Sequence, residues 1–259
     1  METSPNGERP HGRPRVGFIC NADHDVFGAV ADRLQRDDID VRFFEPGTTV
    51  PESAIEDLSL LLNKKVAPES FRALAAADQR GVPTWNGSGT AQLGVRLAGY
   101  HALAQVGCRV PETTFVPPEG EYVAKTFVDW HYEPDPVCNG EGDLYQPLLA
   151  TTGIDHKYYA VDTGDAVDVR VLRTTSKLGG EKEPLGLDDP DPTLAAAVRR
   201  LLRVTESQAL GVDFVETDDG FWAVDVNPAM SFRHAAMEAH LAASVRARLA
   251  VTRPDETVV

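Results

Sequence analysis

An acidic hairpin at residues 211–227 constrains the fold of this chain more than any other segment. In its sequence, GVDFVETDDGFWAVDVN, apolar residues recur at every second position in two runs, which predicts two β-strands. The triplet DDG at 218–220 separates the runs and is typical of a three-residue hairpin loop in which glycine takes the positive φ angle. This loop sets a register in which Asp213 lies directly opposite Asp225.

The same alternation separates the hairpin into an apolar face and an acidic face. The expected apolar face holds Val212, Phe214, Trp222, Val224 and Val226, and the acidic face holds Asp213, Asp225 and Asn227. Like charges opposed across a ladder cost roughly 0.2–1 kcal/mol. A divalent cation such as Mg²⁺, bound by the carboxylates and the amide, would offset that repulsion. The alternative is an amphipathic hairpin whose acidic face is simply hydrated.

The N-terminal third alternates between short apolar runs and helical patterns, which predicts a parallel sheet with helices on both faces. The expected strands are RVGFIC (15–20), IDVRFFEP (39–46), LSLLLN (58–63) and VPTWNG (82–87), and the expected helices are DVFGAVADRLQRD (25–37) and PESFRALAAADQRG (68–81).

Strands dominate the remainder, so the C-terminal part is expected to be α+β. Three further helices are predicted at 90–107, 193–207 and 234–250, and further strands at 110–116, 121–128, 143–149, 157–164 and 166–173, before the hairpin.

Composition narrows the classes of function. The net charge of −15 argues against nucleic acid as a partner. No apolar run reaches membrane-spanning length and no hydrophobic signal core follows the N-terminal arginines, so we expect a cytoplasmic protein without a membrane partner. The acidic balance suggests either a salt-loving source or a GC-rich genome. Lysine is scarce, and each lysine is therefore of interest: Lys64, Lys65, Lys125, Lys157, Lys177 and Lys182.

The order of several motifs resembles the ATP-grasp superfamily. After the Rossmann-like unit come a helix with GCRVPETTF, a strand with VAK, the strand YQPLL, the segment GIDHKYYAVD and finally GVDF…AVDVNP. The likeness is greatest to the RimK-type carboxylate–amine ligases, with the ATP-grasp inositol-phosphate kinases second. It implies an α/β protein with a Rossmann-like pre-ATP-grasp domain at 14–90 and a two-lobed ATP-grasp domain with antiparallel sheets at 91–250. The small lobe would span about 109–150, and residues 1–13 and 251–259 would be disordered tails.

The resemblance also implies which residues bind the nucleotide and its metal. ATP and Mg²⁺, with Mn²⁺ as a substitute, are the expected cofactors. The implied metal ligands are Asp213, Asp225 and Asn227, and the implied phosphate-binding cations are Lys125 and Arg96. Gln146, Pro147, Leu148 and Leu149 would form the adenine hinge, and Asp155 would take the ribose hydroxyls. Since proline has no N–H, the hinge donor would be Leu148 or Leu149.

Catalytic roles are implied for Lys157, which follows Asp155 on the same strand face, and for Arg173. Arg170 and Arg173 cannot share a strand face because they are three residues apart, so at most one faces the site. Three departures limit the match. A short NGEG at 139–142 replaces a glycine-rich lid, NPAMS replaces NxxPG after the metal asparagine, and TTSKLGGEKEPLG lacks the acceptor-binding residues of the family.

Three functions compete. The leading one is an ATP- and Mg²⁺-dependent ligase that forms an amide through an acyl phosphate on a small-molecule or peptide carboxylate. The alternatives are a small-molecule kinase and a nucleotide-binding protein without catalysis. Positioning and cationic stabilisation of a transferring phosphoryl group would serve either enzyme, which explains why no nucleophile stands out. A homo-oligomer is compatible with the sequence, which does not define the oligomeric state.

Overall fold

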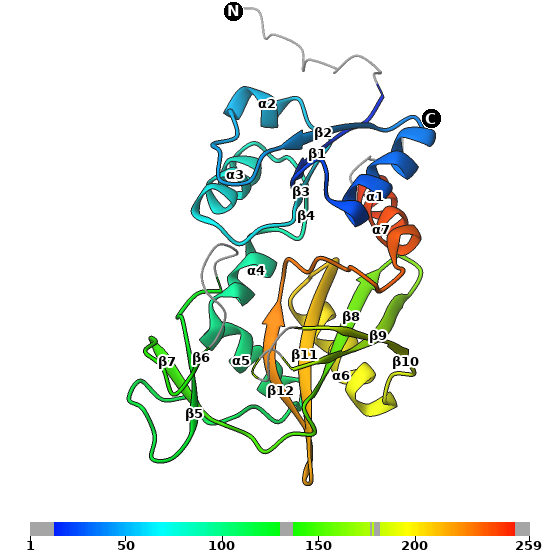
Figure 1. Cartoon of the computed structure of the whole chain (residues 1–259). Helices are drawn as coiled ribbons and strands as arrows, with labels where there is room; N and C mark the ends of the chain where they lie inside the picture. Colours follow the sequence, from blue (N-terminus) through cyan, green and yellow to red (C-terminus); the bar gives the residue numbers. More distant parts are fainter. Residues whose placement is uncertain (1–12, 130–136, 177, 179–181, 252–259) are drawn as a thin grey trace, which may run out of the picture.

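The computed structural model describes residues 13–129, 137–176, 178 and 182–251. Its N-terminal part is a four-stranded parallel sheet in the order β2-β1-β3-β4 (Figure 1). The strands are β1 (Arg15–Ile19), β2 (Asp40–Phe44), β3 (Leu60–Asn63) and β4 (Thr84–Trp85), and the connecting helices are α1 (Asp25–Arg36), α2 (Glu52–Glu56) and α3 (Pro68–Gln79). The predicted parallel sheet with helices on both faces is confirmed, because α1 packs on one face and α2 and α3 on the other.

Two antiparallel sheets follow, as the second half of the sequence predicts. The larger sheet has the order β10-β9-β8-β11-β12 and the smaller one β6-β5-β7. The strands of the larger sheet are β8 (Ile154–Asp162), β9 (Val167–Thr175), β10 (Pro184–Asp188), β11 (Ala209–Thr217) and β12 (Gly220–Asn227), and those of the smaller are β5 (Tyr122–Lys125), β6 (Val137–Cys138) and β7 (Leu144–Pro147). Helix α6 (Pro192–Val204) covers the larger sheet, and Asp191 caps its N-terminus by accepting hydrogen bonds from the N–H groups of Thr193 and Leu194.

The last helix returns to the N-terminal part of the molecule. Helix α7 (Glu238–Val251) packs beside α1, and the indole N–H of Trp85 donates to the hydroxyl of Ser244 at 2.9 Å (Figure 1). One hydrophobic core contains side chains from α1, β1, β3, α7 and the larger antiparallel sheet. The boundary expected near residue 90 therefore marks a change of sheet, not a gap between separate cores. Val251, assigned to a disordered tail, ends α7, and the other tail residues lie almost entirely outside the described ones.

Two predicted elements differ in the structure. The helix expected at 90–107 is broken: α4 (Ser88–Ala91) and a 3₁₀ turn (Gln92–Gly94) precede an extended Val95, and α5 spans Arg96–Gln105. Arg96 therefore begins a new helix. The segment 110–116 forms no strand and contributes one isolated bridge, between Thr114 and Tyr145. Its proline-rich flanks explain this, since proline cannot donate to a ladder.

The hairpin has the predicted pairing of its acids but a different turn. Asp213 pairs with Asp225, as expected. However, Thr217 pairs with Gly220, so the loop has two residues, and the extra residue is a bulge near Val224. Gly220 has the expected positive φ of 101°. The bulge reverses the faces expected for residues 222–224: Ala223 is buried in the core, whereas Trp222 pairs with Val215 and Val224 lines a cavity.

None of the helices among the described residues is long and apolar enough to cross a membrane.

Candidate nucleotide and metal site

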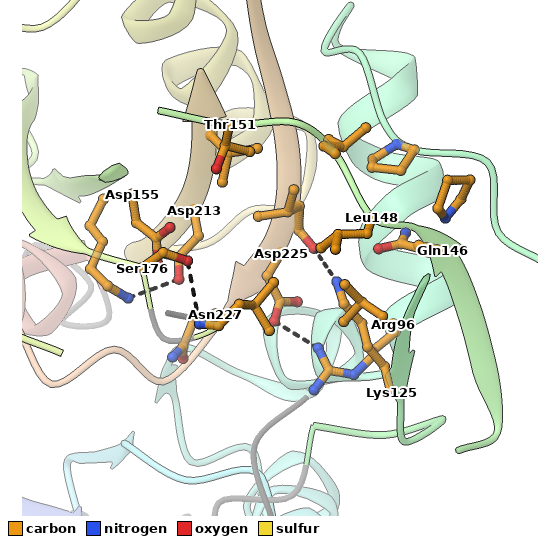
Figure 2. Close-up of a pocket in the computed structure, with 18 of the residues that line it drawn as sticks. Arg96, Lys125, Gln146, Leu148, Thr151, Asp155, Ser176, Asp213, Asp225 and Asn227 are labelled. Carbon is orange, nitrogen blue, oxygen red and sulfur yellow. Dashed lines mark hydrogen bonds and ion pairs between the residues drawn. The ribbon is translucent and has the colours of Figure 1, made fainter. Parts of the chain in front are cut away.

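A cavity of about 460 Å³ lies between the two antiparallel sheets, and Figure 2 shows residues that line it. Its walls come from β5, β7 and the segment after β7 on one side, and from β8, β11 and β12 on the other. All but one of the predicted site residues line it: Arg96, Lys125, Gln146, Pro147, Leu148, Leu149, Asp155, Lys157, Asp213, Asp225 and Asn227. These residues are far apart in sequence, and the two sheets bring them together.

Each of the two opposed aspartates is held by its own cation. Lys157 Nζ lies 2.8 Å from Asp213 Oδ2, and Arg96 Nη1 lies 2.7 Å from Asp225 Oδ2. Burial lowers the pKa of Lys157, but Asp213 outweighs that effect and raises it above the usual range. No metal ion is needed to offset the repulsion between the acids, because two basic side chains already do so.

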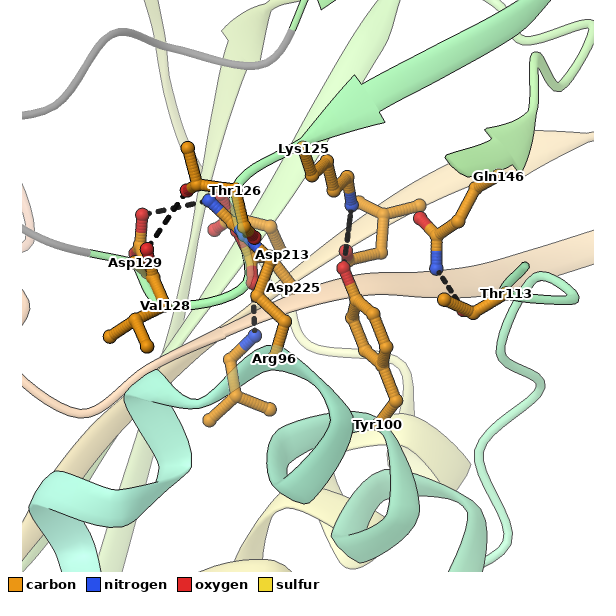
Figure 3. A network of polar contacts seen from close by, with 12 residues as sticks. Arg96, Tyr100, Thr113, Lys125, Thr126, Val128, Asp129, Gln146, Asp213 and Asp225 are labelled. Atoms are coloured by element: carbon orange, nitrogen blue, oxygen red, sulfur yellow. Dashed lines mark hydrogen bonds and ion pairs between the residues drawn. The ribbon is translucent and has the colours of Figure 1, made fainter. Parts of the chain in front are cut away.

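Arg96 connects helix α5 to the loop after β5 (Figure 3). Its side chain is only 3% exposed and also donates to the Thr126 carbonyl at 3.0 Å and to Asp129 Oδ1 at 2.9 Å. Gly99 allows α5 to pack closely on the preceding 3₁₀ turn, since a Cβ at this position would lie 2.9 Å from the Leu93 carbonyl oxygen. Burial opposes the charge, but the two carboxylates outweigh it and raise the pKa of Arg96.

Lys125 is buried at the end of β5 and reaches across the cavity to β12. Its Nζ donates to the Val224 carbonyl at 2.7 Å and to the Tyr100 hydroxyl at 3.0 Å (Figure 3). Burial lowers the pKa of Lys125 to about 8. The bulge near Val224 thus presents a carbonyl that positions this amine. Gly142, in the short glycine-containing segment, packs against the Lys125 backbone, where a Cβ would come within 2.9 Å of its N and O atoms.

The predicted adenine hinge forms one edge of the cavity. Gln146 on β7 is buried and donates to the Thr113 hydroxyl at 2.9 Å. The Leu148 N–H donates to the Glu121 carbonyl at 2.9 Å, which leaves Leu149 as the donor of the two alternatives. The side chains of Leu148 and Leu149 line the cavity and provide an apolar surface there.

Asp155 lies at the opposite end of the cavity, on the same face of β8 as Lys157. Burial raises the pKa of Asp155, and Lys182 Nζ lies 3.5 Å from its carboxylate. Lys182 comes from the segment in which the sequence showed no acceptor-binding residue. Its pKa is lowered to about 8 by burial, despite the attraction of Asp213.

Arg173 does not lie in the cavity, so the catalytic role expected for it is not supported. It pairs with His156 on β8, one residue out of phase with Asp155 and Lys157, and therefore faces the other side of the sheet. There its guanidinium lies 3.2 Å from Asp188, and both side chains are substantially exposed. Arg170 faces the opposite way and donates to the carbonyls of Ala235 and Ala236 at 3.0 and 2.8 Å.

The donor set fits a hard divalent cation that arrives together with phosphate. Two carboxylates and the Asn227 amide project into one cavity, and such oxygens are ligands that Mg²⁺ prefers. Their present partners matter, however. Asp129, Asp213 and Asp225 are balanced by three basic residues, Arg96, Lys125 and Lys157. A lone Mg²⁺ would add uncompensated positive charge, whereas Mg²⁺ with a polyphosphate would not.

Sequence reasoning missed several residues that line the cavity. They are Pro111, Val123, Asp129, Thr151, Gly153, Ser176, Leu178, Lys182, Val215 and Val224. Lys182 had a signal in the scarcity of lysine. No sequence signal marked Val215 and Val224. The bulge that turns Val224 toward the cavity leaves the alternation of apolar residues in the sequence unchanged.

Comparison with known proteins supports the fold. No family model matches the sequence, and no curated protein matches it. Solved structures do match: a RimK-domain ATP-grasp protein from Sphaerobacter thermophilus (TM-score 0.65, 16% identity, 92% of this chain and 99% of that chain). The ATP-grasp ligase PsnB, complexed with minimal precursor, Mg and ADP, matches with a TM-score of 0.65 and 12% sequence identity. This match covers 95% of this chain and 100% of that chain. The macrocyclase MdnC bound with precursor peptide MdnA, from Microcystis aeruginosa, matches with a TM-score of 0.64 and 8% sequence identity. This match covers 93% of this chain and 100% of that chain. The chain has the ATP-grasp fold.

Proposed function

We propose that this protein is an ATP- and Mg²⁺-dependent, ADP-forming ligase that joins a carboxylate to an amine through an acyl phosphate. One observation carries the proposal: the paired carboxylates of the hairpin, three basic side chains and the apolar hinge line a single cavity. The fold supports it, because the solved ATP-grasp ligases share it at near-complete coverage of both chains.

The nucleotide would lie along the cavity with its base at the hinge. The Leu149 N–H and the Pro147 carbonyl would read the adenine, because the main chains of Gln146 and Leu148 face β5. Leu148 would pack on the adenine ring. Asp155 would accept the ribose hydroxyls. Lys125 and Arg96 would contact the phosphates, since both line the cavity and both lie at the side of β12 that carries Asp225.

Asp213, Asp225 and Asn227 would hold Mg²⁺, which supplies charge neutralisation for the phosphate oxygens when bound. The carboxylates would then be shared between the cation and their basic partners. Lys157 lies against Asp213 at the far end of the acidic pair from Lys125. We therefore place Lys157 beside the transferred γ-phosphoryl group, where a point charge stabilises the transition state.

In the first step, a carboxylate oxygen of the substrate would attack the γ-phosphorus, and the bond to the ADP oxygen would break. In the second, an amine would attack the acyl carbon, phosphate would leave, and the amine would lose a proton. The protein needs no nucleophile for this sequence, because positioning and electrostatic stabilisation are enough. Small-molecule kinase activity at the same site is the second candidate.

Product analysis separates the two candidates. Purified protein is incubated with ATP, Mg²⁺ and mixtures of carboxylic acids and amines, and ADP, inorganic phosphate and organic products are measured. The ligase predicts equal amounts of ADP, phosphate and amide. A kinase would yield ADP and a phosphorylated alcohol without free phosphate. ATP binding without ADP formation from any acceptor mixture would favour the binding protein without catalysis.

A further inference from the structure

A second cavity, of about 530 Å³, adjoins the nucleotide cavity and shares Lys157, Lys182 and Asn227 with it. Its other walls come from the loops after β1, β3 and β12 and from strands β8, β9 and β10. The residues that distinguish it are His24, Lys64, Lys65, Ser231, Arg233 and His234. No acidic side chain is among the described residues that line it, although the whole chain carries a net charge of −15.

The distribution of lysine makes this cavity distinctive. The structure describes five lysines, and each of them lines at least one of the two adjoining cavities: Lys64, Lys65, Lys125, Lys157 and Lys182. Lysine on most proteins covers the solvated surface. In a chain this acidic, such concentration of lysine favours a negatively charged ligand in both cavities.

The position of the cavity in the fold is one where ligands bind. In the order β2-β1-β3-β4, the chain leaves β1 for one side of the sheet and reaches β3 on the other, so the strand order reverses between β1 and β3. Ligands of open α/β sheets bind at the carboxyl ends of strands at such a point. His24 follows β1, and Lys64 and Lys65 follow β3 directly.

Lys64 is held in place as part of this wall. Its side chain is 6% exposed, its Nζ donates to the Ala229 carbonyl, and it lies 5.8 Å from the centre of the Phe27 ring. Burial lowers the pKa of Lys64 to about 7. An anion beside this amine would restore its charge, so the pocket favours binding of a negative group over water.

The opposite wall is a loop held in a costly conformation. Phe232, His234 and Ala236 have φ angles of 55°, 63° and 53°, in the left-handed region that non-glycine residues rarely occupy. Phe232 is buried against Phe27 and Tyr159, and Arg170 donates to the carbonyls of Ala235 and Ala236. These contacts fix the loop so that Arg233 and His234 line the cavity.

The segment NPAMS, which departs from the family pattern NxxPG, also belongs to this wall. Met230, in NPAMS, is buried over Gly211 of β11, where a Cβ would overlap its side chain. Met230 therefore packs the loop onto strand β11, two residues from Asp213. The geometry couples the shape of the second cavity to the nucleotide site.

We propose that the second cavity binds the acid substrate, and that this substrate is a small molecule with at least two anionic groups. The proposal rests on the ligase function proposed above. The carboxylate to be activated lies at Lys157 and Lys182, which face both cavities. The second anionic group lies among Lys64, Lys65 and Arg233. The acids paired with these cations do not line the second cavity: Asp25 is 3.8 Å from Arg233, Asp155 is 3.5 Å from Lys182 and Asp213 is 2.8 Å from Lys157.

The test measures binding and turnover with acids of increasing charge. Acetate, succinate, tricarballylate, neutral succinamide and an end-blocked peptide with one glutamate are compared at constant ionic strength, with Mg²⁺ and ATP. We expect thermal stabilisation and acid-dependent ADP formation for succinate or tricarballylate, and little for the others. Stabilisation by acetate or the peptide equal to that by the polyacids, or no effect of any polyacid, would overturn the proposal.

Substitutions assign the effect to the cavity. Lys65→Met and Arg233→Met should each weaken polyacid binding about tenfold, because each removes a charge-assisted contact. Arg203→Met removes an equal charge from the exposed end of α6 and should change nothing. All three variants should bind Mg²⁺ and ATP with native affinity. If the native protein binds Mg²⁺ and ATP but shows no polyacid effect, or if both cavity variants keep native polyacid binding, only this inference is refuted, whereas failure of the native protein to bind Mg²⁺ and ATP refutes the proposed function.

Discussion

Asp213 and Asp225 lie directly opposite each other across the β11–β12 ladder, and each carboxylate contacts a different basic side chain, Lys157 or Arg96. The repulsion between the acids is therefore balanced before any metal binds. Because Arg96 is almost fully buried, its charge must be compensated by the Asp225 carboxylate, just as the charge of Asp225 is compensated by Arg96. This relationship determines how the protein should respond to substitution, pH and ligand.

Asp225→Asn should destabilise the protein in the absence of metal. The substitution weakens a charge-assisted hydrogen bond to buried Arg96, and we expect a loss of about 1–3 kcal/mol in the free energy of unfolding. Urea denaturation in the presence of a chelator measures it. Asp188→Asn, which removes the exposed partner of Arg173, serves as the control and should cost less than about 0.5 kcal/mol. A more stable Asp225→Asn variant would show that repulsion between the acids outweighs the ion pair.

The sequence predicted this hairpin well and its turn poorly, for one physical reason. A hairpin loop with an extra residue and a bulge farther along the strand give the same offset between Asp213 and Asp225. Alternation of apolar residues cannot distinguish the two, because alanine and valine fit either face. Only packing against α5 and the core decides that Ala223 is buried and that Val224 points toward the site.

Other parts of the site depended on contacts that sequence cannot show. Lys125 and Asp155 were found because their motifs carry local signals. Lys182 and the second cavity were missed because their residues come from six separate segments, which meet only through sheet order and the return of the loop after β12. The partner of Arg96 was missed because the break at Val95 is invisible in an unbroken helical pattern.

Lys125→Met should weaken ATP binding by about tenfold or more, because it removes a buried positive charge beside the proposed phosphates. Calorimetric titration with ATP and Mg²⁺ measures the effect. Lys65→Met is the matched control, since Lys65 lines the second cavity alone and should leave ATP affinity within about twofold. Equal affinity in folded Lys125→Met and native protein would remove Lys125 from the nucleotide site.

Arg173→Ala should retain native ATP-dependent turnover, because its side chain faces away from the cavity. Lys157 lies on the neighbouring strand β8, on the face that lines the cavity. Lys157→Met should reduce kcat about a hundredfold or more, because Lys157 is proposed to stabilise the transferring phosphoryl group. ADP formation with an active acid and amine pair provides the measurement. If Arg173→Ala loses activity while its fold is intact, the assignment of strand faces to the two roles is incorrect.

The stability of the protein should depend on the ionisation of Lys64. Burial lowers its pKa from 10.5 to about 7. Between these values the unfolded chain binds more protons at this residue than the folded one, so Lys64 makes the protein more stable as pH rises through that window. Its contribution to the slope approaches about 1.4 kcal/mol per pH unit. Denaturation from pH 7 to above pH 9 should show a steeper rise of stability with pH in the native protein than in Lys64→Met, because the buried Lys125 and Lys182 contribute equally to both proteins.

Binding of Mg²⁺ and ATP by the native protein tests the central claim most directly. Because the charges at the site are already balanced, Mg²⁺ alone should neither bind measurably nor raise the melting temperature. ATP should bind weakly with a chelator and much more tightly with Mg²⁺, and that difference should vanish in the Asp213→Asn, Asp225→Asn double variant. Calorimetric titration of folded protein under these conditions decides the matter. Equal ATP affinity with and without Mg²⁺, or no binding in either condition, would contradict the assignment of the hairpin carboxylates to a magnesium–nucleotide site.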